Sequence, residues 1–411
     1  MHLLLFNRAY YPEQSATGQL LTELAEGLVH DHGCRVSIIC GVAPKSTACE
    51  NQPSWVGNPV SIRGVTVFRC AGTSFSKKIL AGRICNYLTY FASSFIASRR
   101  VKKPDLVLSM TDPPIIGLAA LWTARQSQCR FIMAYSDIFP EVSRLLENFS
   151  NPLIEKILDQ VNRFLIRSAD RILALDDDMR NRLIHEKNAR AELISIITNW
   201  ADTEKTYPVS KRNPFSEQHG LADKFVALYA GNFGASQDLE QLLESAALLK
   251  GLPDFIFAFV GDGVRKEALQ NRARTLDLSH VRFFPYQTKE ALLGVYGAAD
   301  CCIVSLKKGV SGYITPSKLY GVLAAGRPYI AAIDATSETS RIALQFRCGL
   351  QAAPGNAVDI AEKIRFLYDH RELCKTMGEN ARNAAFGFDR KKVIQQYHDL
   401  FTTMTATAAP N

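Results

Sequence analysis

Short apolar runs alternate with segments of helical periodicity along most of the chain. In the first half these runs predict strands at His2–Phe6, Arg35–Cys40, Val65–Cys70, Leu106–Ser109, Phe131–Ala134 and Ile172–Leu175. Between the first two runs, Thr17–His30 places five apolar residues on one helical face (Leu20, Leu21, Leu24, Ala25 and Leu28). Strands separated by helices require crossover connections, so the pattern predicts a parallel sheet in a doubly wound α/β domain.

The alternation stops at Thr203–Asp223 and then starts again. This segment is polar, contains two prolines and has no periodicity, which is typical of a linker. After it, strands are predicted at Phe225–Ala230, Phe255–Val260, Val281–Phe284, Cys301–Leu306 and Tyr329–Ala332. Helices are predicted between them at Leu239–Leu249, Val264–Leu276, Lys289–Gly297 and Ser317–Ala325, and after them at Ala357–Tyr368, Arg371–Ala384 and Arg390–Met404. We therefore expect domains at residues 1–202 and 224–388, a linker at 203–223 and a closing helix within 389–411. Two similar α/β halves imply a cleft, where ligands commonly bind.

Composition narrows the class of protein. The chain has 411 residues, of which 47% are hydrophobic and 21% charged, as in globular proteins of two or three domains. No apolar stretch approaches the roughly 20 residues of a membrane-spanning helix. The N-terminus lacks the basic region and cleavage site of a signal peptide, and the ten cysteines form no CxxC pair. We expect free thiols and a cytoplasmic setting.

The net charge of +8 is unevenly distributed. Residues 51–104 contain nine Lys or Arg and no Asp or Glu, and the segment Phe75–Lys103 interleaves seven of these basic residues with aromatic and aliphatic ones. Such a helix-compatible segment suits an anionic membrane interface, or a core helix with a solvated basic end. No nucleic-acid-binding signature accompanies it.

Two glycine-rich turns follow strands in the second half. Residues 229–234 read YAGNFG, and residues 260–263 read VGDG with Arg265 close behind. Backbone N–H groups in such turns can face phosphate oxygens, although each turn is also explained as a tight connection.

A third motif, TPSKLYGVLAAGRP at residues 315–328, predicts a short helix. Pro316 fixes its entry, Ser317 is a suitable N-cap and Gly326 ends it. Lys318 in the first turn opposes the helix dipole, which indicates a residue facing an anion rather than a structural one.

The ordered set of motifs resembles glycosyltransferase family 4, the retaining group 1 glycosyltransferases. The set comprises GNFG, VGDG, VRFFPYQ, ADCCIVSL, PSKLYGVLAAGRP and FDRKKVIQQYHDLF, preceded in the first half by YYPEQSATGQLLTELAEGL, SMTDPP, YSDIFPE, LALDDDMRNRL and ITNWADTE. The resemblance covers nearly the whole chain and is closest to the bacterial surface-polysaccharide branch that includes N-acetyl-L-fucosamine transferases. It implies a GT-B fold: two Rossmann-like domains facing a central cleft, the first for the acceptor and the second for a nucleotide sugar. The closing helix is expected to cross back to the first domain.

The resemblance also implies site residues. The donor pyrophosphate is expected at Pro316, Ser317 and Lys318, with the glycine loops and neighbouring positions also contacting the donor (Gly231, Asn232, Gly234, Gly263 and Arg265). Backbone groups at Phe284, Pro285 and Tyr286 are expected to hold uracil, and Thr17 and Gly18 to lie near the donor phosphate and the acceptor. Asp137 is expected to face the cleft and orient the acceptor; the alternative is N-capping of the following turn. No metal and no cofactor is implied.

The chain departs from the family pattern at several positions. The Glu-x7-Glu pair of many members falls on Tyr313 and Gly321, so no carboxylate is available there for the ribose hydroxyls or the donor sugar. The Arg and Lys of the first loop correspond to Asn232 and Gln237, and the His before the acceptor-side Asp is Ser136. Lys318, with Arg265 or Lys307, could supply the lost positive charge.

Two further features have structural explanations. The Asp176–Asp178 run resembles a DxD metal motif, but it precedes a predicted helix, so N-capping explains it. Seven apolar residues at helical spacing within Asn151–Ser168 favour domain packing over membrane contact (Leu153, Ile154, Ile157, Leu158, Val161, Phe164 and Leu165).

Together these features predict a metal-independent, retaining glycosyltransferase. We expect it to use a UDP-sugar and a polyprenyl-diphosphate-linked saccharide at the inner face of the plasma membrane, in O-antigen or capsule biosynthesis. Two alternatives are a UDP-sugar 2-epimerase of the same fold and an inactive nucleotide-sugar-binding subunit. A Rossmann dehydrogenase is disfavoured because Gly231-x-x-Gly234 is not GxGxxG and no acidic residue ends the second strand.

Overall fold

The computed structural model describes residues 1–13, 15–42, 55–75, 80–146 and 151–406. The chain divides into two compact units. Unit 1 comprises residues 1–144, 148–198 and 393–411, and unit 2 comprises residues 145–147 and 199–392. The closing segment of the chain is thus assigned to the unit that contains the N-terminus.

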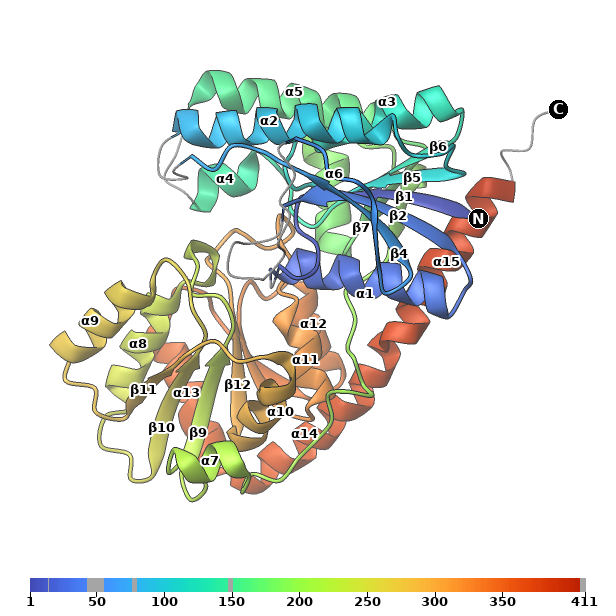
Figure 1. Ribbon diagram of the computed structural model, residues 1–411. Coiled ribbons are helices and arrows are strands. Elements are labelled where there is room, and N and C mark those ends of the chain that lie inside the picture. Colours follow the sequence, from blue (N-terminus) through green and yellow to red (C-terminus); the bar gives the residue numbers. More distant parts are fainter. Residues whose placement is uncertain (14, 43–54, 76–79, 147–150, 407–411) are drawn as a thin grey trace. The chain divides into compact units, whose positions relative to one another are not determined.

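Unit 1 is built on an eight-stranded sheet of order β3-β4-β2-β1-β5-β6-β7-β8 (Figure 1). Every neighbouring pair is parallel except β3 and β4, which are antiparallel. The strands are β1 His2–Phe6, β2 Arg35–Gly41, β3 Val60–Ile62, β4 Val65–Cys70, β5 Leu106–Ser109, β6 Arg130–Ala134, β7 Arg171–Ala174 and β8 Ile194–Ile196. The chain first winds outward from β1 and later outward from β5, so the topological switch point lies between these two strands, where open α/β sheets bind ligands.

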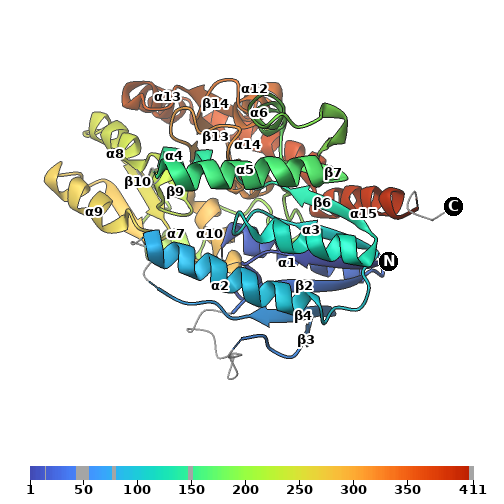
Figure 2. The same ribbon diagram turned by 90° about the horizontal axis from the view of Figure 1, so that it is seen from above.

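The helices of unit 1 cover both faces of this sheet. They are α1 Ala16–His30, α2 Leu80–Ser98, α3 Ile116–Ser127, α4 Glu141–Leu146, α5 Pro152–Ser168 and α6 Asp177–Lys187. Helices α2, α3 and α5 lie side by side on one face, and α1 lies on the other (Figures 1 and 2). Of α15, Arg390–Ala406, residues 393 onward belong to unit 1.

Unit 2 contains a fully parallel six-stranded sheet of order β11-β10-β9-β12-β13-β14. Its strands are β9 Phe225–Ala230, β10 Phe255–Val260, β11 Val281–Phe284, β12 Cys301–Ser305, β13 Tyr329–Ala332 and β14 Gly349–Ala352. Its helices are α7 Pro214–Gln218, α8 Leu239–Leu248, α9 Lys266–Thr275, α10 Lys289–Ala298, α11 Lys318–Ala324, α12 Glu338–Gln345, α13 Ala357–Asp369 and α14 Arg371–Ala385. Its short 3-10 helices are η2 Ala235–Gln237 and η3 Phe386–Phe388, whereas η1 Ala191–Leu193 belongs to unit 1. The switch point of this sheet lies between β9 and β12.

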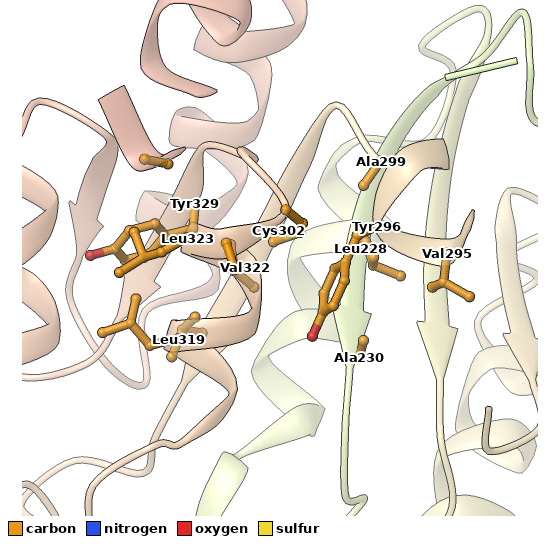
Figure 3. Packing of buried hydrophobic residues seen from close by; sticks show 14 of the residues in the cluster. Leu228, Ala230, Val295, Tyr296, Ala299, Cys302, Leu319, Val322, Leu323 and Tyr329 are labelled. Atoms are coloured by element: carbon orange, nitrogen blue, oxygen red, sulfur yellow. The ribbon is translucent and has the colours of Figure 1, made fainter. Parts of the chain in front are cut away.

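The core of unit 2 lies on both faces of its sheet. Successive side chains of β9 alternate between two clusters, because neighbouring residues of a strand point to opposite faces. Leu228 and Ala230 pack with residues of α10 and α11 in one cluster (Figure 3), and Tyr229 packs with Phe233 and Phe259 in the other. The apolar runs of the sequence are therefore strands buried on both faces.

Two expectations from the sequence need correction. Residues 203–223, interpreted as a linker, lie within unit 2 and include α7, which starts with a capping box at Asn213 and Pro214 in its first turn. Helix α11 begins at Lys318, and the Ser317 side chain makes no capping hydrogen bond because Ser317 itself has helical backbone angles. In contrast, the Asp176 side chain accepts a hydrogen bond from Met179 N at 2.7 Å and caps α6, as expected.

Among the described residues no helix is both long and apolar enough to cross a bilayer. The nine described cysteines are all free.

Candidate functional site

The two glycine loops of unit 2 pack directly against each other at the carboxyl edge of the sheet. Gly231 follows β9 and Gly261 follows β10, and both have positive φ angles (146° and 148°). A Cβ atom on Gly261 would lie 1.9 Å from the Gly231 carbonyl oxygen, and one on Gly263 would lie 2.6 Å from the Phe233 oxygen. Only glycine permits this approach, so these glycines have a structural role whatever else they do.

The loops leave some backbone donors for a ligand. Gly231 N donates to Val260 O and Phe233 N donates to Asp262 O, so these two amides are used within the loops. Within the part of the chain that the structure describes, the amides of Asn232 and Gly234 make no backbone hydrogen bond outside regular helices and strands. These two N–H groups are therefore the donors of the GNFG loop that remain for an anion.

Lys318 extends from the start of α11 to the same loop. Its Nζ donates to the Tyr229 hydroxyl at 2.5 Å and lies 3.7 Å from the centre of the Tyr229 ring. The Tyr229 hydroxyl in turn donates to Asn232 O at 2.7 Å. A Cβ atom on Gly231 would be only 2.9 Å from Lys318 Nζ, so glycine at this position makes room for the ammonium group.

The electrostatic environment of Lys318 is unusual for a lysine. Desolvation by burial lowers its pKa to about 7. Among the described residues no carboxylate is paired with Lys318, and no charged group acts on its pKa. A partly buried cation beside free backbone amides is suited to holding an anion.

The other predicted donor-site residues have partners of their own or are exposed. Asn232 contacts both Gly234 and Gly263, since its side-chain atoms lie 2.7 Å from where Cβ atoms on either would be. The Arg265 side chain forms an ion pair with Glu240 at 3.5 Å. Tyr286 is exposed beyond the end of β11, and Gln287 Nε2 donates to Pro285 O at 3.1 Å. Pro316 and Ser317 precede Lys318 in the chain, without a side-chain cap.

The positions of the missing carboxylates are occupied differently. Tyr313 is buried. A Cβ atom on Gly321 would lie 3.1 Å from the Tyr296 hydroxyl oxygen, which therefore occupies the space that a side chain at 321 would enter. Tyr296 belongs to the same buried cluster as Ala230, the last residue of β9 (Figure 3). A neutral hydroxyl thus stands next to the position where many family members have a carboxylate.

Unit 1 gathers charged residues at its own switch point. Arg8 follows β1 and Asp112 follows β5, and Arg8 Nη2 lies 3.0 Å from Asp112 Oδ2. Arg8 is also within 3.9 Å of Glu13. The opening of α1 contributes Thr17 and Gly18, and the Gly18 carbonyl accepts a hydrogen bond from the Thr22 hydroxyl at 2.7 Å.

Asp137 follows β6, the next strand along this edge. Burial, together with the smaller effect of the nearby Asp112 carboxylate, raises the pKa of Asp137 to about 7. No capping hydrogen bond to Asp137 is present among the described residues, so the structure gives no support to N-capping. A carboxyl group with a pKa near neutral pH, one strand away from the switch point, is suited to contact a substrate hydroxyl.

Sequence reasoning did not single out Arg8, Asp112, Tyr229 or Tyr296. Arg8 and Asp112 could have been found because each follows a predicted strand by two or three residues, at the edge where ligands bind. Tyr229 and Tyr296 gave no such signal, since each belongs to an apolar segment. Among the described residues, no group of three or more His, Cys, Asp or Glu is arranged to hold a metal ion.

The chain is similar to glycosyltransferases, both in family models and in individual relatives. The family model "Glycosyl transferases group 1" matches residues 211–384, and the model "Glycosyl transferase 4-like domain" matches residues 16–200. WcaI of Escherichia coli K12, assigned as a glycosyl transferase of colanic acid biosynthesis, is 26% identical to this chain. The match spans 84% of this chain and 86% of the length of WcaI. WbjE of Pseudomonas aeruginosa, assigned as a glycosyltransferase, is 27% identical over 82% of this chain and 81% of its own.

Solved structures of low identity share the whole fold. HepE of Anabaena in complex with UDP has a TM-score of 0.75 at 17% identity. The superposition covers 98% of this chain and 100% of the HepE chain. WaaG, a glycosyltransferase involved in lipopolysaccharide biosynthesis, has a TM-score of 0.70 at 15% identity and covers 97% and 99%. The expected GT-B fold class is confirmed.

Proposed function

The chain belongs to the group 1 glycosyltransferases, and we propose that it is a retaining, metal-independent enzyme that takes its sugar from a UDP-sugar. The acceptor in this proposal is a polyprenyl-diphosphate-linked saccharide, and the product serves a bacterial surface polysaccharide such as O-antigen or capsule. The assignment of WcaI to colanic acid biosynthesis supports the pathway class, and the UDP bound by HepE supports the nucleotide. N-acetyl-L-fucosamine or another N-acetyl sugar is the donor sugar proposed from the resemblance.

The observation that carries the proposal is the arrangement of Lys318 against the GNFG loop. The ammonium group and the amides of Asn232 and Gly234 can contact the donor diphosphate together. Charge develops on that diphosphate as the bond between the sugar C1 and the phosphate oxygen breaks. Donors held in place before the reaction stabilise this charge without reorganisation, so they favour departure of UDP.

The remaining step needs little from the protein. The acceptor hydroxyl attacks C1 on the face that UDP leaves, and its proton passes to the departing phosphate oxygen. Asp137 at the edge of the sheet in unit 1 would hydrogen-bond the acceptor and orient it. No strong general base and no metal ion is required by this scheme.

A transfer assay tests the proposal. The full-length protein is incubated with radiolabelled UDP-sugars and a short-chain polyprenyl-diphosphate saccharide, with and without EDTA. Label in the lipid fraction that persists in EDTA, with retained anomeric configuration by NMR, supports the proposal. Conversion of the donor without an acceptor would indicate the epimerase, and UDP binding without any turnover would indicate the inactive subunit. Loss of transfer in EDTA that Mn²⁺ or Mg²⁺ restores would refute metal independence.

A further inference from the structure

The outer surface of α2 is apolar along its length. The residues at helical spacing that face away from the sheet include Cys85, Leu88 and Ile96, with exposed fractions of 54% for Leu88 and 39% for Ile96. The helix contains no Asp or Glu. A surface helix of a globular protein ordinarily presents charged and polar residues on this side, so the pattern of α2 is the reverse of the usual one.

Helix α5 has a second exposed apolar stripe. Leu153, Ile157 and Phe164 are 67%, 50% and 46% exposed. Their spacing of four and seven residues puts them on one face, together with the exposed Lys156 and Arg167. The packing role expected for these apolar residues from the sequence therefore holds only for the opposite side of the helix, where Leu165 and Ile166 are buried.

Helix α3 lies between the other two, and all three form one layer (Figure 2). Its Trp122 ring is 4.5 Å from the ring of Phe95 on α2, which ties the two helices together at the surface. The α2–α3–α5 face, defined by the outward side chains of these three helices, is thus one continuous surface within unit 1.

The charges around this face are basic. Arg99, Arg100, Lys102 and Lys103 are exposed just after α2, and Arg125 is exposed at the end of α3. Helix α3 also contains no Asp or Glu. Helix α5 has two carboxylates: that of Asp159 is paired with Lys187 and Arg163, and Glu155 is half-buried in the first turn. None of these five basic side chains forms an ion pair with another residue that the structure describes, so the face combines exposed apolar side chains with positive charge.

We infer that the α2–α3–α5 face docks unit 1 onto an anionic lipid bilayer, with Leu88, Ile96, Leu153, Ile157 and Phe164 entering the headgroup region and the basic residues contacting lipid phosphates. Apolar insertion combined with Lys and Arg at the rim is the chemistry of peripheral membrane helices. The inference rests on the proposed function only for its purpose, since a polyprenyl-linked acceptor lies in a membrane.

Charge complementarity favours lipid over a second copy of this chain. A symmetric dimer through this face would place the same basic surface of both copies in one interface, where like charges oppose association. An anionic leaflet instead concentrates the opposite charge along the whole face.

Sedimentation with liposomes tests the inference on the full-length protein. Variant A changes the α5 stripe, Leu153→Gln, Ile157→Gln and Phe164→Gln. Variant B changes the basic cluster, Arg99, Arg100, Lys102 and Lys103→Glu. Matched controls change exposed residues of unit 2: Leu248, Leu344 and Val358→Gln for variant A, and Arg272, Arg347, Arg365 and Lys375→Glu for variant B.

We expect the wild-type protein and both controls to bind vesicles that contain anionic lipid. They should bind neutral vesicles much more weakly. Variant B should bind at least 100-fold more weakly, since each exposed basic residue near the surface contributes about 5-fold. Variant A should bind anionic vesicles at least about 10-fold more weakly than the wild-type protein. Because its apolar contribution is reduced, added salt should remove a larger fraction of the binding that remains. UDP affinity, measured by calorimetry, should be unchanged in all variants.

Three results would overturn the inference. One is that variants A and B bind anionic vesicles as tightly as the wild-type protein. Another is that the matched unit 2 controls lose as much vesicle affinity as variants A and B. The third is sedimentation velocity showing a dimer that variant A converts to a monomer, since the face would then be a protein interface. Each leaves the proposed transfer reaction standing if a water-soluble short-chain acceptor is still glycosylated.

Discussion

Lys318 is the residue on which the donor site depends most. Lys318→Met should weaken UDP binding by roughly 10- to 100-fold, because a cation that donates to a diphosphate forms charge-assisted hydrogen bonds of about 1.5–3 kcal/mol. Calorimetric titration with UDP measures the effect. Lys375→Met, at an exposed position on α14, is the control and should change affinity little. Equal affinity in a folded Lys318→Met protein would refute the assignment.

The burial of Lys318 also predicts a pH dependence. Its pKa near 7 in the free protein means that the ammonium form loses population as pH rises through 7. UDP binds the protonated form, so its affinity should fall between about pH 7 and 9 and binding should take up a proton near pH 8. Titrations in two buffers of different ionisation enthalpy measure the proton uptake, which Lys318→Met should abolish.

Asp137 should make the use of the acceptor increase with pH, whereas Lys318 makes UDP affinity decrease. Its pKa of about 7 means that the carboxylate, which can accept a hydrogen bond from the acceptor hydroxyl, forms only as pH rises through 7. The kcat/KM for acceptor should rise over this range at saturating donor. Asp137→Asn should lower it about 10-fold or more and flatten the profile. A variant that keeps both the rate and the rising limb would exclude Asp137 from acceptor recognition.

Tyr296 should contribute to ribose recognition in place of the missing carboxylate. Its hydroxyl occupies the space beside Gly321, and one neutral hydrogen bond is worth about 1 kcal/mol, or roughly fivefold. Tyr296→Phe should therefore reduce the preference for UDP over its 2′,3′-dideoxy analogue by about that factor. Competition binding with the two nucleotides measures the ratio. An unchanged preference would contradict this role.

Single residues show where sequence reasoning reached its limit. Lys318 was identified because a cation in the first turn of a helix conflicts with the helix dipole, and that conflict is visible in the sequence. Tyr296 and Tyr229 were missed because their rings are buried like any core residue, and only the position of their hydroxyl oxygens distinguishes them. The pairing of Arg8 with Asp112 was missed because it joins residues 104 positions apart.

At the scale of elements, prediction worked best for the strands of the sheet cores. The run Phe255–Val260 is short, continuously apolar and bounded by turn signals, which is typical of a parallel strand buried on both faces, and all six residues of β10 are buried. Helix α12 was missed because its buried face is made of small and polar residues such as Thr339 and Ser340, which carry little hydrophobic periodicity. The exposed stripe of α5 was misinterpreted because periodicity shows that a face is apolar but not what covers it.

The packing of α4, α5 and α6 depends on one buried cation. Lys187 on α6 is fully buried, and its Nζ lies 2.7 Å from Glu141 Oε1 on α4 and 2.6 Å from Asp159 Oδ1 on α5. Lys187→Met should reduce the free energy of unfolding of unit 1 by about 3 kcal/mol, because it leaves the Glu141 carboxylate without its cation and leaves Asp159 with Arg163 alone. Hydrogen exchange in peptides of unit 1, measured at increasing urea concentration, gives the free energy of unfolding of this unit.

The control for Lys187 is a partly exposed pair of the same type. Lys363→Met breaks an i,i+4 contact of 3.4 Å with Asp359 on α13 and should cost less than about 0.5 kcal/mol. If both variants have equally small effects, Lys187 does not hold the three helices together.

At the scale of the whole molecule, the last helix of the chain belongs to the first unit. Residues from Val393 onward are assigned to unit 1, and Ile394 packs so closely on α1 that a Cβ atom on Gly27 would lie 2.6 Å from it. The His398 ring stacks on His32 at 4.3 Å, and the Thr405 hydroxyl contacts the sulfur of Met1 at 3.6 Å. Unit 1 is therefore complete only when the end of the chain has joined its beginning.

This arrangement predicts that a substitution near the C-terminus destabilises the N-terminal unit. Phe401 is fully buried, so Phe401→Ala should cost about 3–5 kcal/mol, whereas Thr402→Ala at the neighbouring exposed position should cost less than about 0.5 kcal/mol. Hydrogen exchange should increase in peptides covering α1 and β1 and stay unchanged in β9, β10 and α11, and UDP affinity should be retained because Lys318 and the glycine loops lie in unit 2. Faster exchange confined to unit 2, or loss of UDP binding with unit 1 intact, would show that the closing helix supports the donor unit instead.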